Sequence, residues 1–254
     1  MRLPRRLLHG EEATLVEHLD ELRKRIFVSL GALVVGFVIA FVFHHRLLHW
    51  LNAPLPKSRG NPITLGVAEP FLTAMKVSLM AAIAIAFPVL VWQLWRFLAP
   101  AVEERAERTV LYFVLLATVL LIAGIAFGYW VALPKAVHFL TNFDQTEFNI
   151  QIRAKDYYSF VLTVLLAVGV VFELPIFILA LVRLNVLSTE TLRHNRRLGY
   201  FIVAIIGVLL PGIDPVTTTL ETVPLLVLYE ASIWLAVIVE RREPHAEPAN
   251  VPEP

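Results

Sequence analysis

The stretch FVLTVLLAVGVVFELPIFILALV, residues 160–182, decides the fold class, because it is apolar almost throughout and carries a single charge, Glu173. A helix needs roughly 20 apolar residues to cross the hydrocarbon core of a bilayer. The 254-residue chain is 57% hydrophobic and only 17% charged, whereas a soluble domain is about 45–50% apolar. The stretch and the composition together predict an all-α integral membrane protein.

Five further apolar segments accompany this one. At 1.5 Å per residue the segment 198–210 is only about 20 Å long, so it either thins the bilayer or packs against its neighbours. We expect it to form a short hairpin with the segment that follows it. Residues 1–242 are predicted to be one membrane domain, and the Pro-rich, polar residues 243–254 a disordered cytoplasmic tail. The six predicted transmembrane helices cover residues 26–43, 77–95, 110–131, 160–182, 198–210 and 223–239.

Lysine and arginine counts predict the orientation, since cytoplasmic loops carry an excess of both. The segments on one side of the six spans carry fifteen of these residues, and the two loops on the other side carry six. Both termini are therefore predicted to be cytoplasmic. The two outer loops, residues 44–74 and 134–159, are predicted to be long, and the inner loops short.

Glu173 is the one carboxylate that we place clearly inside the membrane. A charge at the bilayer centre costs roughly 3 kcal/mol on insertion scales. One interpretation is a protonated side chain that hydrogen-bonds a neighbouring helix. The other is a functional group that faces a polar cavity and meets a substrate, a partner helix or a proton. Pro175 predicts a kink here, because it removes a backbone donor and clashes with the preceding turn.

An amphipathic helix is predicted to precede the first span. In TLVEHLDELRKR, residues 14–25, Thr14 and Glu17 form a capping-box pattern. The pairs Asp20–Lys24 and Glu21–Arg25 are four residues apart and attractive. One interpretation of this helix is an interfacial anchor, and the functional interpretation is that it displays Glu21 at the membrane face.

Two further groups of polar residues lie near the predicted ends of spans. Glu103, Glu104 and Glu107 gather on the inner loop that follows Pro100, where a solvated face is the simpler interpretation. Asp214 followed by Pro215 has the pattern of an N-cap with proline in the first turn, which is sufficient to start a helix.

Signatures of enzymes are missing from the sequence. The chain has no cysteine, which excludes disulfides, thiolate metal sites and a cysteine nucleophile. It has no zinc-binding His-Glu-x-x-His pair, no Gly-x-Ser-x-Gly elbow and no phosphate-binding loop. We therefore expect no catalytic residues, no bound metal and no cofactor.

Several motifs in order resemble one family, TatC, the polytopic core subunit of the twin-arginine (Tat) protein translocase. The resemblance extends over most of the chain, and GVVFELPI contains its Phe-Glu-x-Pro signature. The motifs are HLDELRKR (18–25), APL (53–55), PVLVWQLWRFLAPA (88–101), FGYWVALPKAVHFL (127–140), GVVFELPI (169–176), LLPGIDP (209–215) and LVLYEASI (226–233).

The resemblance implies both a fold and a function. The fold is a concave bundle of six helices in the cytoplasmic (inner) membrane. The function is to bind signal peptides that carry two adjacent arginines and, with single-span partners of the TatA and TatB type, to export folded proteins. The protonmotive force drives this transport, and a homo-oligomer within the complex is expected. The family is not an ATPase, which agrees with the missing phosphate loop.

The resemblance also implies roles for individual residues. Glu21, with Arg23 and Arg25 beside it, matches a carboxylate implicated in recognising the arginine pair, and Phe97 matches an aromatic residue of the same site. Three positions match residues implicated in transport or partner contact, namely Pro54, Glu173 and Asp214.

The chain departs from the family pattern at two places. The family has a glutamate nine residues after the loop phenylalanine, where this chain has Ala106. Glu107 restores the glutamate with a shift of one residue and is favoured, with Glu103 and Glu104 as alternates. A Ser-Gln pair that often follows the outer aspartate is replaced by Thr217 and Thr218.

Two other functions are weighed against this one. A proton-coupled small-solute transporter would use Glu173 as its titrating group. Against it stand the absence of an internal repeat, the short final hairpin and the single clearly intramembrane carboxylate. A purely structural scaffold is the third hypothesis, and it would tolerate changes at Glu21, Phe97 and Glu107.

Overall fold

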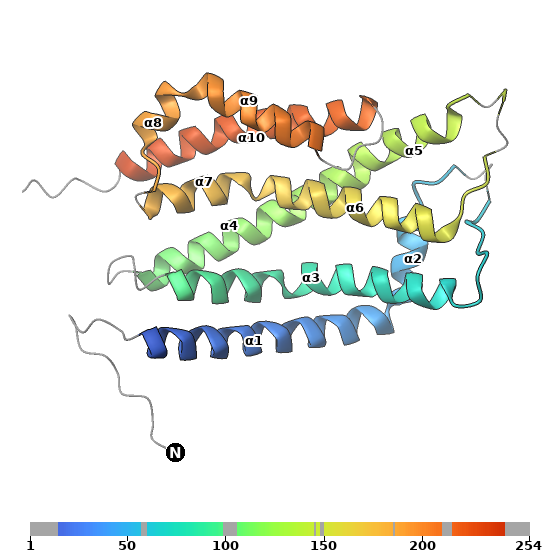
Figure 1. Ribbon diagram of the computed structural model, residues 1–254, viewed down its shortest axis with the longest axis horizontal. Coiled ribbons are helices and arrows are strands. Elements are labelled where there is room, and N and C mark those ends of the chain that lie inside the picture. Colours follow the sequence, from blue (N-terminus) through green and yellow to red (C-terminus); the bar gives the residue numbers. More distant parts are fainter. Residues whose placement is uncertain are drawn as a thin grey trace, which may run out of the picture.

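The chain folds as a bundle of helices in the computed structural model (Figure 1), which confirms the predicted all-α fold. The only β contact among the described residues is an isolated bridge between Ile63 and Arg153. The residues that the structure describes are 15–56, 60–98, 106–144, 146–147, 150–184, 186–209 and 215–241. The helices are α1 (Leu15–Val42), α2 (His44–Asn52), α3 (Glu69–Leu98), α4 (Ala106–Phe127), the π-helical turn η3 (Gly128–Ala132), α5 (Leu133–Asn142), α6 (Ala154–Phe172), α7 (Leu174–Arg183), α8 (Thr189–His194), α9 (Arg196–Leu209) and α10 (Pro215–Arg241).

Within these described ranges, five helical segments are long and apolar enough to cross a membrane. They are Leu19–Val42, Glu69–Phe97, Val110–Asn142, Ala154–Arg183 and Pro215–Ile238. The predicted fifth span, 198–210, corresponds to α9, which has 14 residues and is therefore about 21 Å long. The number of six spans and the orientation of the termini stay predictions.

The helices extend beyond the apolar windows that predicted them, so the expected long outer loops are wrong in extent. Much of the first loop, 44–74, is helical, because α2 begins at His44 and α3 begins at Glu69. The predicted third span corresponds to α4, which continues through η3 into α5 and so passes Pro134 and reaches Asn142. A π turn shifts the hydrogen-bond register by one residue, so the helix passes a proline that has no N–H to donate.

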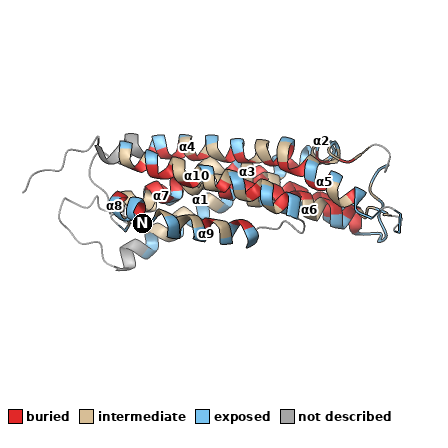
Figure 2. Cartoon of the chain, turned by 90° about the horizontal axis from the view of Figure 1, so that it is seen from above, coloured by how far each residue is buried: buried red, intermediate tan, exposed pale blue. Residues whose placement is uncertain are grey.

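Close helix crossings hold the bundle together. A Cβ atom added to Gly36 of α1 would lie 2.9 Å from the carbonyl oxygen of Ala82 in α3. A Cβ atom on Gly124 of α4 would lie 2.8 Å from Cβ of Phe172 in α6. Figure 2 shows the buried residues along the inner faces of the helices. The segment Ala154–Arg183 is 50% buried and Leu19–Val42 only 11%, so α1 lies at the edge of the bundle.

The bundle has two ends, which we name by the short helices they carry (Figure 1). The α2 end holds α2, the C-terminus of α5 and the loops 60–68 and 143–153. The α8 end holds α8, the start of α1, the end of α3 and the start of α4. The described residues of the predicted signal-peptide site lie at the α8 end, Pro54 lies at the α2 end, and Glu173 lies between the two ends.

Candidate functional site

Glu21 lies on the second turn of α1, where it forms the predicted ion pair with Arg25. Nε of Arg25 donates to Oε1 of Glu21 at 3.1 Å, and Nη2 contacts the same oxygen. Nη2 also donates to the carbonyl oxygen of Arg96 at 2.9 Å, near the end of α3. The side chain of Glu21 is 36% exposed and that of Arg25 only 16%. Arg25 therefore joins the carboxylate to the end of α3, and one face of the carboxylate stays open to solvent.

Phe97 follows Arg96 directly, so the structure brings the ends of α1 and α3 together at two of the predicted site residues. Arg23 lies directly before Lys24, whose predicted ion pair with Asp20 is formed at 3.5 Å with both side chains exposed. The guanidinium of Arg23 lies 5.7 Å from the ring centroid of Phe27, on the exposed surface of α1. The site thus offers one half-exposed carboxylate, a neighbouring aromatic residue and an exposed cation.

Glu107 is not in a loop, contrary to the sequence prediction. Helix α4 begins at Ala106, so Glu107 belongs to its first turn, where a carboxylate is favoured by the helix dipole. Glu103, Glu104 and Asp214 lie outside the described residues, as do Thr14, Pro100 and the predicted tail. The predicted start of a helix at Pro215 is confirmed by the first residue of α10.

Glu173 lies at the predicted kink, where it is the single residue between α6 and α7, and its backbone keeps right-handed helical angles (φ −77°, ψ −8°). Pro175 follows in the first turn of α7 and is fully buried. The side chain of Glu173 is half-buried, and its Oε1 atom is buried without a hydrogen-bond partner among the described residues. Because a buried polar atom normally has a partner, this carboxyl group is a candidate for contact with a molecule outside the chain.

Pro54 lies in the turn that follows α2, on the opposite end of the bundle. The last carbonyl groups of a helix have no partner within the helix. Here Tyr129 donates its hydroxyl to the carbonyl oxygen of Trp50 at 2.8 Å, and Tyr157 donates to that of Leu51 at 2.9 Å. The turn containing Pro54 is therefore fixed to η3 and α6, with Leu51 and Leu55 of its two flanks in the core.

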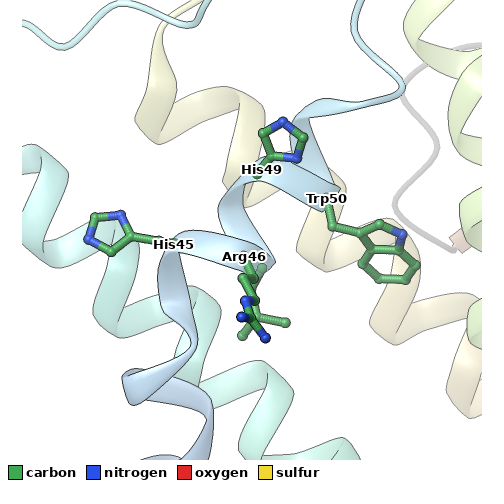
Figure 3. Close-up of a pocket in the computed structure, with 5 residues that line it drawn as sticks. His45, Arg46, His49 and Trp50 are labelled. Carbon is green, nitrogen blue, oxygen red and sulfur yellow. The ribbon is translucent and has the colours of Figure 1, made fainter.

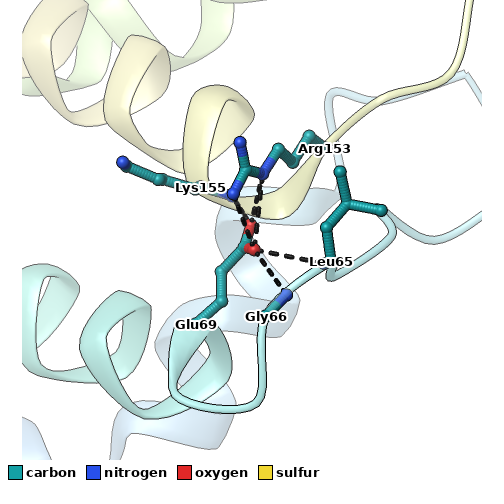
Figure 4. A network of polar contacts seen from close by, with 5 residues as sticks. All are labelled: Leu65, Gly66, Glu69, Arg153 and Lys155. Atoms are coloured by element: carbon teal, nitrogen blue, oxygen red, sulfur yellow. Dashed lines mark hydrogen bonds and ion pairs between the residues drawn. The ribbon is translucent and has the colours of Figure 1, made fainter.

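A carboxylate that sequence reasoning missed, Glu69, ties the two loops of the α2 end together (Figure 4). It is 6% exposed and accepts from the backbone N–H groups of Leu65, Gly66 and Lys155 at 3.0–3.2 Å. Nε of Arg153 donates to its Oε1 at 3.1 Å. The hydrogen bond and the charge of Glu69 raise the pKa of Arg153 above its ordinary value. The signal available in the sequence was a lone glutamate directly before a proline at a helix start.

Two further carboxylates correct the prediction that Glu173 is the single clearly intramembrane one. Glu230 lies inside α10, where it accepts from Nη1 of Arg196 at 2.8 Å and from the hydroxyl of Tyr200 at 2.5 Å. Glu221, also in α10, is 2% exposed. Glu230 lies within the predicted sixth span and within the motif LVLYEASI. Glu221 was missed because that span was predicted to begin at residue 223.

Metal binding finds no support in this arrangement. In the part of the chain that the structure describes, no three histidine, aspartate or glutamate side chains gather as metal ligands. The buried and half-buried carboxylates are spread over the α2 end (Glu69), the residue between α6 and α7 (Glu173) and α10 (Glu221 and Glu230).

Known proteins of one kind resemble this chain in sequence and in structure. Residues 17–224 match the model of the family described as "Sec-independent protein translocase protein (TatC)". TatC of Carboxydothermus hydrogenoformans is 34% identical over 237 residues, which cover 93% of this chain and 98% of that one. TatCd of Bacillus subtilis is 34% identical over 94% of this chain and 98% of its own length.

A crystal structure of a TatC protein also resembles this chain. The twin arginine translocase receptor TatC, crystallised in DDM, superimposes with a TM-score of 0.76 and 36% sequence identity, covering 87% of this chain and 99% of that one. These relatives are components of a protein translocase and are not enzymes, and the apolar helices agree with a protein of the membrane. The chain therefore belongs to the TatC family of Sec-independent protein translocase components.

Proposed function

We propose that this protein is the receptor of the Tat translocase for signal peptides with two adjacent arginines. The observation that carries the proposal is the junction of α1 and α3, where Arg25 joins the half-exposed carboxylate of Glu21 to the carbonyl group of Arg96, next to Phe97. A planar guanidinium binds a carboxylate through two parallel hydrogen bonds, which the ammonium group of lysine cannot reproduce. A carboxylate at this junction suits an arginine of the peptide.

Arg25 has a defined part in this proposal. It holds the Glu21 carboxylate through one oxygen, Oε1, so the other oxygen remains available for an arginine of the peptide. The second arginine of the peptide would pair with Glu107 in the first turn of α4, with Glu103 and Glu104 as alternates. Arg23 would flank the pair, and Phe97 would offer an aromatic face to a guanidinium group.

Glu173 is assigned to the transport step that follows binding. Its partnerless Oε1 atom supports a contact with a polar group of a partner helix or with a hydrated path through the membrane. Pro54 and Asp214 are proposed to act in transport or partner contact as well.

The wider assembly is proposed from the same family membership. The protein would lie in the cytoplasmic (inner) membrane with both termini and the α8 end in the cytoplasm. Single-span partners of the TatA and TatB type and further copies of this chain would complete a complex that exports folded proteins by the protonmotive force. The lysine and arginine distribution supports this orientation, because the side predicted as cytoplasmic carries fifteen of these residues.

Binding of a synthetic twin-arginine signal peptide to the full-length protein in detergent tests the receptor role. A twin-lysine peptide is run beside it, and both are repeated with Glu21→Gln and Glu107→Gln. We expect arginine-specific binding that Glu21→Gln weakens about tenfold, the factor for one charge-assisted hydrogen bond. Asp20→Gln is the matched control, because Asp20 is 61% exposed and pairs with Lys24 outside the junction. Equal binding of both peptides, or of wild type and Glu21→Gln, would contradict the proposal.

A further inference from the structure

Helix α2 carries and contacts a cluster of aromatic side chains at its end of the bundle. Trp50 stacks on Tyr129 with ring centroids 3.9 Å apart, and Tyr157 and Tyr158 donate to carbonyl groups of the same helix. Tyrosine and tryptophan concentrate at the interface of a membrane with water. The aromatic cluster therefore marks the headgroup level at the α2 end.

An apolar cavity opens below this level, between α2, α3, α4 and α6. Its volume is about 270 Å³. Its walls are almost entirely aliphatic and include Leu47, Trp50, Ala84, Leu121 and Leu165. A protein cavity of roughly 150 Å³ holds benzene, which has six carbons, so this cavity has room for roughly ten carbons of an alkyl chain.

A basic residue of α2, Arg46, lies on the same side of the helix as Trp50, which lines this cavity. A second hollow on α2 is lined by His45, Arg46 and His49 and shares Leu47 and Trp50 with the cavity. In Figure 3, Arg46 and Trp50 leave α2 toward the lower part of the view, and His45 and His49 leave it in other directions. The guanidinium of Arg46 lies 5.5 Å from the ring centroid of Phe43, its side chain is exposed, and it forms no ion pair with any described residue.

We propose that the cavity and Arg46 together bind one anionic glycerophospholipid of the leaflet at the α2 end. One acyl chain occupies the cavity, and the phosphate accepts hydrogen bonds from the Arg46 guanidinium, a geometry that suits phosphate. Helix α2 contains no acidic residue, so a headgroup with a net negative charge is favoured over a zwitterionic one, whose cation would lie against Arg46.

Native mass spectrometry of the full-length protein tests this site, with phosphatidylglycerol and phosphatidylcholine of identical acyl chains as probes. We expect a first phosphatidylglycerol to bind about tenfold more tightly than phosphatidylcholine, and Arg46→Gln to remove that preference. Lys135→Gln is the matched control, since Lys135 is an exposed cation of α5 that lines neither hollow.

Substitutions that fill the cavity provide a second test of the lipid site. Ala84→Leu places three extra carbons in the cavity and should weaken both lipids, whereas Val89→Leu on the exposed face of the same helix should change neither. Equal affinity for the two lipids in wild type, or no effect of Arg46→Gln and Ala84→Leu, would overturn the proposal. Loss of the preference for phosphatidylglycerol on addition of inorganic phosphate alone would also overturn it. So would displacement of the lipid by one equivalent of a signal peptide, because the peptide would then be the occupant of the cavity.

Discussion

Two carboxylates of this protein, the buried Glu69 and the half-buried Glu173, are placed in opposite chemical surroundings. Glu69 accepts hydrogen bonds from three backbone N–H groups and from Arg153. Glu173 lies at the break between two helices, and its buried Oε1 atom has no partner in the part of the chain that the structure describes. Both residues are glutamates with a proline within the next two positions, Pro70 and Pro175, so residue type alone does not distinguish them.

The difference separates a structural carboxylate from a functional candidate. A buried charge is costly unless it is paired and hydrogen-bonded, and Glu69 meets this requirement inside the chain, where it joins loops 60–68 and 143–153. Glu173 leaves the requirement unmet, so its partner is expected to come from outside the chain. Four substitutions test this contrast, in order of decreasing effect on stability.

Glu69→Ala is expected to cause the largest loss of stability, because it leaves a guanidinium and three backbone N–H groups without their acceptor. We expect the Tm of the full-length protein in detergent to fall by several degrees, as followed by intrinsic tryptophan fluorescence. Glu147→Ala is the control, since Glu147 is exposed on the loop that Glu69 fixes. An unchanged Tm would mean that the two loops are held by other contacts.

Gly124→Val is expected to cost about 1–3 kcal/mol, the range for overpacking a close contact. Its Cβ atom would lie 2.8 Å from Phe172 and 3.0 Å from Cα of Gly169, so it disturbs the helix break without altering the Glu173 carboxyl group. The control is Gly31→Val, because no atom lies within 4 Å of a Cβ atom there. Denaturant unfolding measures both variants, and equal stabilities would show that α4 and α6 separate at little cost.

Glu21→Gln is expected to change stability by less than about 1 kcal/mol, because its pair with Arg25 is half-exposed and such pairs are screened by solvent. The same change is expected to weaken binding of the twin-arginine peptide about tenfold. Thermal unfolding and peptide binding are measured on one preparation. A large loss of stability would make Glu21 a structural residue like Glu69.

Glu173→Gln is expected to have the smallest effect on stability, because the amide keeps the shape of the side chain and has no charge to desolvate. Export of a folded cargo by cells that depend on this protein is nevertheless expected to fall about tenfold or more, the factor for a lost charge-assisted contact. If the variant exported cargo normally and also bound the signal peptide normally, Glu173 would have no function in transport. The proposed difference between Glu173 and the structural residue Glu69 would then be wrong.

Local signals predicted much of the candidate site. The spacing of Glu21 and Arg25 predicted their ion pair, which the structure contains. Pro175 predicted a kink, and the helix breaks at Glu173. The family motifs were correct in identifying the protein, since they depend on residue order alone. The predicted loop position of Glu107 was wrong, because helices continue into polar flanks that an apolar window excludes.

The sequence by itself determined the class of the protein, its apolar helices, the helix break and its family, because these depend on composition and on contacts between residues near in the chain. Only the tertiary structure decided which carboxylates have partners from distant parts of the chain. Glu69 meets Arg153 across 84 positions, and Arg25 meets Arg96 across 71. Such contacts form between loops and helix ends that packing brings together, and no periodicity or local motif encodes them.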